Sequence, residues 1–85
     1  MTESQRALLR AIAAGQRLKD HRDIDGLKTY VLHAADDTGT PVAAADVEAL
    51  VEAGLISSNK KFPAATYWLT DAGRAESRAE GGEGA

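Results

Sequence analysis

The chain has 85 residues and 44% hydrophobic residues, which is typical of one small globular domain and excludes a chain too polar to fold. It contains no cysteine, so disulfides and cysteine-based zinc sites are excluded, and a reducing compartment fits. The formal net charge is −3, with 13 acidic residues against 10 lysines and arginines, which counts against a surface that is basic all over. No apolar run approaches the roughly 20 residues that span a bilayer, and the first residues show no signal-peptide pattern. We therefore expect no membrane contact and a cytoplasmic location.

The first expected element is a helix over residues 3–14. Thr2 and Gln5 have the spacing of a capping box, in which each side chain satisfies a backbone amide at the start of the helix. Apolar residues then recur at helical spacing, and Gly15 supplies a stop.

A β-hairpin is expected over residues 16–33. The stretch Asp23–Gly26 has aspartate at the first and glycine at the fourth position of a type I turn, which suits a three-residue loop with a glycine bulge. This register pairs Leu18 with Leu32, Asp20 with Tyr30 and Arg22 with Lys28. A two-residue turn at Asp25-Gly26 gives a different register, and the sequence leaves this choice open.

Thr40 followed by Pro41 predicts the start of a second helix after a polar connection, with Thr40 as the N-cap. Gly54 is expected to end this helix in a left-handed conformation. The helix contains no lysine or arginine, so DNA phosphates would repel it from a major groove. Its acidic residues are Asp46, Glu48 and Glu52.

A second hairpin, a wing, is expected from strands over residues 56–58 and 65–69, with residues 59–64 at its tip. Tyr67 and Trp68 are adjacent in the second of these strands, so their side chains should point to opposite faces. One of the two aromatic rings should therefore be buried and the other exposed.

Thr70 is placed to cap a short last helix over residues 71–78. The following residues are acidic, rich in glycine and poor in apolar side chains, which is typical of disorder. The expected organisation is thus a single domain over residues 1–78 and a disordered tail over residues 79–85.

The stretches Gly54-Leu55-Ile56 and Tyr67–Arg74 (YWLTDAGR) resemble the C-terminal half of bacterial winged-helix regulators of the MarR and PadR kind. This resemblance covers about residues 40–78 and implies a small α+β, winged-helix-like domain of the order helix, hairpin, helix, hairpin (the wing) and short helix, with DNA binding and transcription regulation. One departure is that a helix normally stands directly before the recognition helix, and here a hairpin and a loop take that place. The whole chain more loosely resembles the small bacterial YjhX-like family, described as toxins, from which we carry over no activity.

The tip of the wing offers the best candidates for contact with nucleic acid, because wing tips can lie along phosphates and lysine is a suitable point charge. Basic side chains on the first hairpin would continue the basic surface of the wing tip, although neighbouring aspartates can neutralise them across the strands. A solvated tip that protects a sheet edge is the alternative. The predicted DNA-contacting residues are Asn59, Lys60, Lys61, Arg17, Lys19 and Arg22.

No catalytic or cofactor site is expected, because the chain has no glycine-rich phosphate loop and no nucleophile with a dedicated base. His21 and His33 match no metal-ligand spacing, so no metal site is expected either.

These features predict a small bacterial DNA-associated or regulatory protein that contacts double-stranded DNA phosphates through its wing. Sequence preference should be weak, and a homodimer would compensate for the low affinity of a module with few cations. The alternative is a protein–protein interaction module, antitoxin-like or a phage-type adaptor, that keeps the winged scaffold without binding DNA. A toxin enzyme is the least favoured interpretation.

Overall fold

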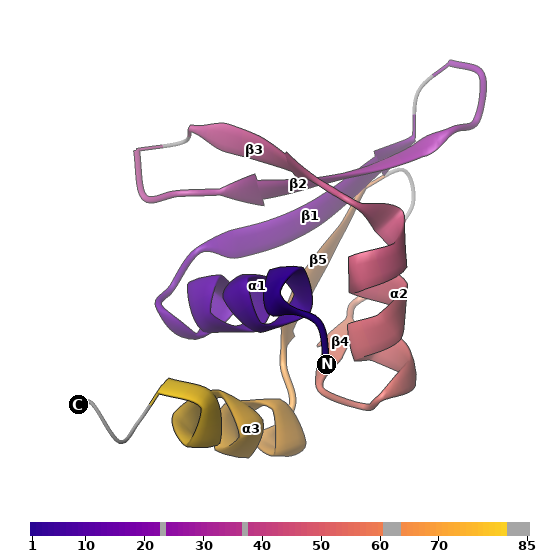
Figure 1. The fold of residues 1–85 in the computed structure, drawn as a ribbon. Helices are drawn as coiled ribbons and strands as arrows, with labels where there is room; N and C mark the ends of the chain where they lie inside the picture. The colour runs from indigo at the N-terminus through magenta and orange to yellow at the C-terminus, as the bar shows by residue number, and fades with distance from the viewer. Residues whose placement is uncertain (23, 37, 61–63, 82–85) are drawn as a thin grey trace.

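The computed structural model of the protein describes residues 1–22, 24–36, 38–60 and 64–81. This part of the chain is α+β, with three helices and a five-stranded antiparallel sheet (Figure 1). None of the helices within the described ranges is both long and apolar enough to cross a membrane. The elements are α1 (Glu3–Ala13), β1 (Arg17–Arg22), β2 (Lys28–His33), β3 (Gly39–Val42), α2 (Ala44–Glu52), β4 (Ile56–Ser58), β5 (Ala64–Leu69) and α3 (Asp71–Gly81).

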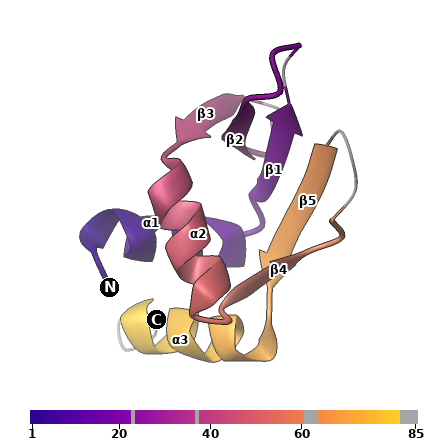
Figure 2. The ribbon, with the colours of Figure 1, turned by 90° about the vertical axis from the view of Figure 1, so that its right-hand side faces the viewer.

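The strands are ordered β3-β2-β1-β5-β4, so the first strand of the chain lies at the centre of the sheet. The two hairpins, β1–β2 and β4–β5, are joined by pairing of β1 with β5. Figure 2 shows that α1 and α2 lie against one face of the sheet, and that α3 lies on the same side. None of the helices in the described part of the chain lies on the opposite face of the sheet (Figures 1 and 2).

The hydrophobic core lies between the sheet and the helices. Each strand sends alternate side chains into it, as the pleat requires, and the helices supply the facing apolar residues. Leu9 and Leu18 are completely buried, and each such leucine stabilises the fold by about 1.5–3 kcal/mol relative to an exposed position. The core residues are Leu8, Leu9, Ile12, Leu18, Tyr30, Val47, Leu50, Leu55, Ile56, Ala65, Tyr67 and Leu69.

Three predicted helix ends are confirmed. Thr2 forms the capping box of α1 with Gln5. Gly54 ends α2 with a φ of +77°, a conformation that glycine adopts at no steric cost. The hydroxyl of Thr70 accepts a hydrogen bond from the amide of Gly73 (3.0 Å) and donates one to the carbonyl of Gly54 (2.6 Å). Thr70 therefore caps α3 and ties its start to the end of α2.

The start of α3 packs directly on the backbone that follows α2. A Cβ atom added to Gly73 would collide with the carbonyl oxygen of Leu55, so only glycine permits this approach. The helix then runs to Gly81, three residues beyond the end predicted at residue 78. Residues 82–85 of the predicted tail lie outside the described residues.

The register of the first hairpin is the one predicted with a three-residue loop and a glycine bulge. Leu18 pairs with Leu32, Asp20 with Tyr30 and Arg22 with Lys28. The alternative register, with a two-residue turn at Asp25-Gly26, is therefore wrong.

The predicted helix start at Thr40-Pro41 is also wrong. Both residues lie in β3, an edge strand that pairs with β2, and α2 begins at Ala44 after an N-cap, Ala43, that makes no side-chain hydrogen bond. An edge strand tolerates proline, and pairing here brings Val42 against the core. Together these interactions outweigh a cap worth about 1 kcal/mol.

Candidate nucleic-acid interface

The open side of the sheet displays every second strand residue. In β1, Leu18 and Asp20 point to the helices, whereas Arg17, Lys19 and His21 point away from them. Cross-strand partners share a face, so the register extends this set over all five strands. We call the set the outer face: Arg17, Lys19, His21, Thr29, Val31, His33, Gly39, Pro41, Ser57, Ala64, Thr66 and Trp68.

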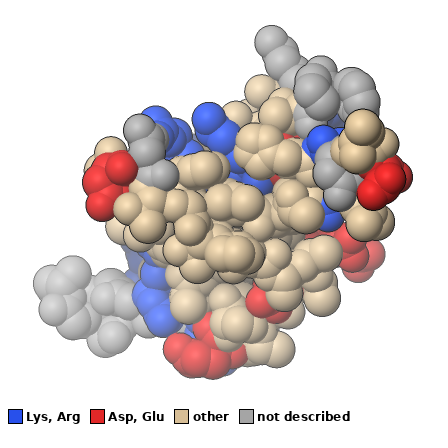
Figure 3. All heavy atoms as spheres, turned by 90° about the horizontal axis from the view of Figure 1, so that it is seen from above, with Lys and Arg blue, Asp and Glu red and all other residues tan. Residues whose placement is uncertain are grey.

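The outer face contains basic residues but no acidic one among its described positions. Arg17 and Lys19 are joined there by His21 and His33, whose rings meet edge to face with centroids 6.4 Å apart. Figure 3, which looks at the molecule from above, shows a largely uncharged middle, with groups of basic and of acidic side chains around the margin. At the border, hydrogen bonds from the hydroxyl and from the backbone amide of Thr38 (amide to carboxyl oxygen, 3.0 Å) hold the pKa of the Asp36 carboxyl below its usual value.

Trp68 is the large apolar aromatic side chain of this face. Trp68 is 46% exposed, while its neighbour Tyr67 is buried, which confirms the predicted division between the two. The cross-strand partner of Trp68 is Ser57, a small residue that cannot cover a large ring. On the other side, the β1–β5 register continued by one residue places Arg17 opposite Trp68.

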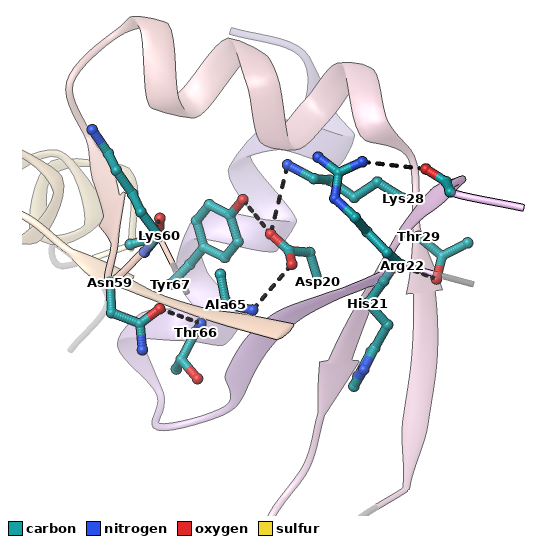
Figure 4. Close-up of polar contacts among 12 residues, drawn as sticks. Asp20, His21, Arg22, Lys28, Thr29, Asn59, Lys60, Ala65, Thr66 and Tyr67 are labelled. Carbon is teal, nitrogen blue, oxygen red and sulfur yellow. Dashed lines mark hydrogen bonds and ion pairs between the residues drawn. The ribbon is translucent and has the colours of Figure 1, made fainter. Parts of the chain in front are cut away.

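The predicted DNA-contacting residues fall on two sides of the sheet. Arg17 and Lys19 lie on the outer face, and Asn59 extends it, because its side-chain oxygen accepts a hydrogen bond from the Thr66 amide (3.3 Å). The alternation of β1 sends Arg22 to the helix side, and Figure 4 shows its side chain pointing away from that of His21. The remaining two predicted residues are Lys60, which lies on the helix side, and Lys61, which lies outside the described residues.

The helix side carries an open hollow of about 830 Å³ between α2 and the ends of β1, β2, β4 and β5. Its charged rim is mixed, because three cations from the hairpins face acidic side chains of α2. Lys60 stands at this rim with a left-handed backbone (φ +56°), and its amide donates to the Ser58 hydroxyl (3.2 Å). The charged residues of the rim are Arg22, Lys28, Lys60, Glu48 and Glu52.

At the floor of this hollow, Asp20 is a buried carboxylate with both oxygens engaged (Figure 4). One oxygen accepts the Ala65 amide (3.0 Å) and the other accepts the Tyr67 hydroxyl (2.8 Å), with the Lys28 ammonium 3.8 Å away. Burial and the hydrogen bond to Asp20 raise the pKa of Tyr67 far above its usual value, so this hydroxyl stays a donor. The ring of Tyr67 also stacks on Tyr30, with centroids 6.0 Å apart. This cluster joins β1 to β5.

Sequence reasoning missed this polar cluster, although one signal for it was present. The predicted register already placed Asp20 opposite Tyr30, on the same face of the hairpin as Leu18. A charged residue at an inward strand position needs partners, because an unpaired buried charge is costly.

Within the described ranges, no three or more histidine, aspartate or glutamate side chains come together as a group that could hold a metal ion. Comparisons with models of protein families, with curated proteins and with solved structures find no match to this chain. The resemblances to winged-helix regulators and to the YjhX-like family therefore stay predictions.

Proposed function

We propose that the protein binds nucleic acid and contacts its phosphates through the outer face. The observation that carries this proposal is the segregation of charge: the chain has a net charge of −3, yet the described positions of this face hold Arg17 and Lys19 and no acidic residue. Basic side chains that neutralise phosphates supply most of the affinity for nucleic acid, whatever its sequence. The exposed Trp68 beside them adds a flat apolar surface.

This proposal places the phosphate contact on the sheet and not on α2. In a winged-helix-like arrangement, which we propose on the succession of α2, the β4–β5 wing and α3, the helix before the wing would enter the major groove. Here β3 rather than a helix directly precedes α2, and α2 carries Asp46, Glu48 and Glu52. A sheet face without acidic residues suits phosphates better than this helix does. The setting we propose is a DNA-associated or regulatory role in a bacterial cytoplasm.

The test compares two double variants that remove equal charge from opposite sides of the sheet. Fluorescence anisotropy with labelled random-sequence oligonucleotides, duplex and single-stranded, would be measured at about 50 and about 150 mM salt. Arg17→Ala/Lys19→Ala should weaken binding at least about five-fold. It should also make binding less sensitive to salt, because each lost phosphate contact reduces the slope of log affinity against log salt concentration by nearly one unit. Arg22→Ala/Lys60→Ala, the matched control, should stay within about two-fold of wild type.

Two results would refute the proposal. One is no binding by wild type at tens of micromolar protein, even at low salt. The other is equal weakening by both double variants, which would show that the outer face is not where the phosphates lie. Circular dichroism would verify that both variants are folded.

A further inference from the structure

A second hollow, of about 600 Å³, opens at the end of the sheet where β5 meets the end of α1 and one side of α3. Trp68 lines it, together with arginines from two elements. No aspartate or glutamate is among the described residues that line this hollow. We call it the Trp68 hollow and define it by Trp68, Arg17, Arg74, Arg78, Gln16 and Thr66.

The arginines that line the hollow come from β1 and from α3. Arg17 is the first residue of β1 and, by register, faces Trp68. Arg74 donates to the carbonyl of Leu69 (3.3 Å) and pairs with Asp71, so its guanidinium is fixed and partly neutralised. Arg78 follows Arg74 by four residues in α3 and therefore lies on the same side of that helix.

This combination selects for a ligand with two parts. An exposed indole offers stacking to a flat ring, and guanidinium groups offer charge and paired hydrogen bonds to an anion such as phosphate. A nucleotide carries both parts on adjacent atoms. In a duplex, however, each base is already stacked and paired, so its face cannot reach a side chain on a sheet.

We infer that the protein binds single-stranded nucleic acid, with one base stacked on Trp68 in the Trp68 hollow and the adjoining phosphates at Arg17 and Arg78. This inference rests on the proposed function and names its substrate class. From Arg17 the strand continues along the outer face to Lys19, the next residue of β1 on that face and about 6.8 Å further on. Nothing acidic interrupts this path at the described positions of β1 and β5 on that face.

The chain provides its own probe for this inference, because Trp68 is its only tryptophan. Its fluorescence would be titrated with an unlabelled single strand of about twelve random nucleotides, a length suited to one small domain. A duplex of the same length and a nucleoside monophosphate would be titrated alongside. The single strand should quench the fluorescence saturably and bind several-fold more tightly than the duplex, and the monophosphate should bind much more weakly.

Two substitutions separate stacking from simple apolar contact. Trp68→Leu should weaken single-strand binding in the anisotropy assay by roughly ten-fold, which is typical of one lost stacked base. Trp68→Phe, which keeps an aromatic face, should recover much of this loss. Because the side chain is half-exposed, neither substitution should unfold the protein.

Three outcomes would overturn the inference while the proposed function stands. The single strand could bind without quenching and with an affinity that Trp68→Leu does not change, or the duplex could bind more tightly than the single strand. The third outcome is that the monophosphate quenches the fluorescence as strongly as the single strand does. The last would make the Trp68 hollow a site for free nucleotides. Binding to neither form of nucleic acid would refute both proposals together.

Discussion

Replacing Asp20 by alanine tests the polar cluster that joins the two hairpins. The substitution leaves two buried donors without an acceptor, the amide of Ala65 and the hydroxyl of Tyr67. Each orphaned donor costs about 1–3 kcal/mol, so the gross loss is about 2–6 kcal/mol. Part of this loss is recovered because an ionised carboxylate is no longer buried. We expect a net loss of about 2–4 kcal/mol, a large share of the roughly 4–13 kcal/mol that stabilises a domain of this size.

A double-mutant cycle with Tyr67→Phe shows whether this loss comes from the hydrogen bond. Tyr67→Phe alone should cost about 1.5–3 kcal/mol, because its hydroxyl donates to a charged acceptor. In Asp20→Ala/Tyr67→Phe the hydroxyl is absent rather than orphaned, so the double variant should be more stable than the sum of the single losses predicts. The coupling free energy should be about 1–3 kcal/mol.

The assay is urea unfolding followed by far-ultraviolet circular dichroism, with the transition midpoint and slope fitted for each variant. Glu48→Ala removes an exposed carboxylate and serves as control, with an expected change within about 0.5 kcal/mol. A loss below about 1 kcal/mol for Asp20→Ala, or additive losses in the cycle, would refute the assignment of Asp20 as the polar link between the hairpins.

Three further predictions concern local contacts. Gly73→Ala should lower the free energy of unfolding by more than about 2 kcal/mol in the same urea assay, since the added Cβ meets the Leu55 carbonyl and the helical gain of about 1 kcal/mol cannot compensate; a neutral or stabilising effect would contradict the close approach. Thr70→Ala should cost at least about 1 kcal/mol by thermal unfolding, because α3 loses its cap, and an unchanged melting temperature would argue otherwise. The pKa of Tyr67 is raised in the folded state, so the stability this hydroxyl confers is complete below the unfolded pKa of about 10 and is lost as pH rises beyond it. The stability difference between wild type and Tyr67→Phe should therefore narrow above about pH 10, and a constant difference there would disprove this linkage.

Local signals in the sequence were enough to predict most elements of this fold. Gly54 and Thr70 mark helix ends through chemistry confined to a few neighbouring residues, and the alternation of β1 gives the inward and outward sides of the first hairpin. The prediction of a helix start at Thr40-Pro41 was wrong because the same two residues suit both a helix start and an edge strand. What decides between them is pairing with β2, which depends on the rest of the sheet.

The candidate site was less predictable, because it depends on one non-local pairing. Strands β1 and β5 are more than 40 residues apart in the chain, and only their pairing brings Trp68 next to Arg17 and Tyr67 next to Asp20. Grouping cations by proximity in the sequence also joined Arg22 to Arg17 and Lys19, although an odd spacing along a strand sends a side chain to the other face.

The placement of all three helices on one side of the sheet has a consequence for how this protein can change over generations. Core packing constrains the inward residues of each strand, whereas the outward ones touch solvent and one another, so most substitutions there should alter stability little. Selection could therefore rewrite positions such as Lys19, Thr29, Val31 and Thr66 to suit a new ligand without refolding the scaffold. The same separation makes the outer face a natural place to randomise residues in a library of engineered binders.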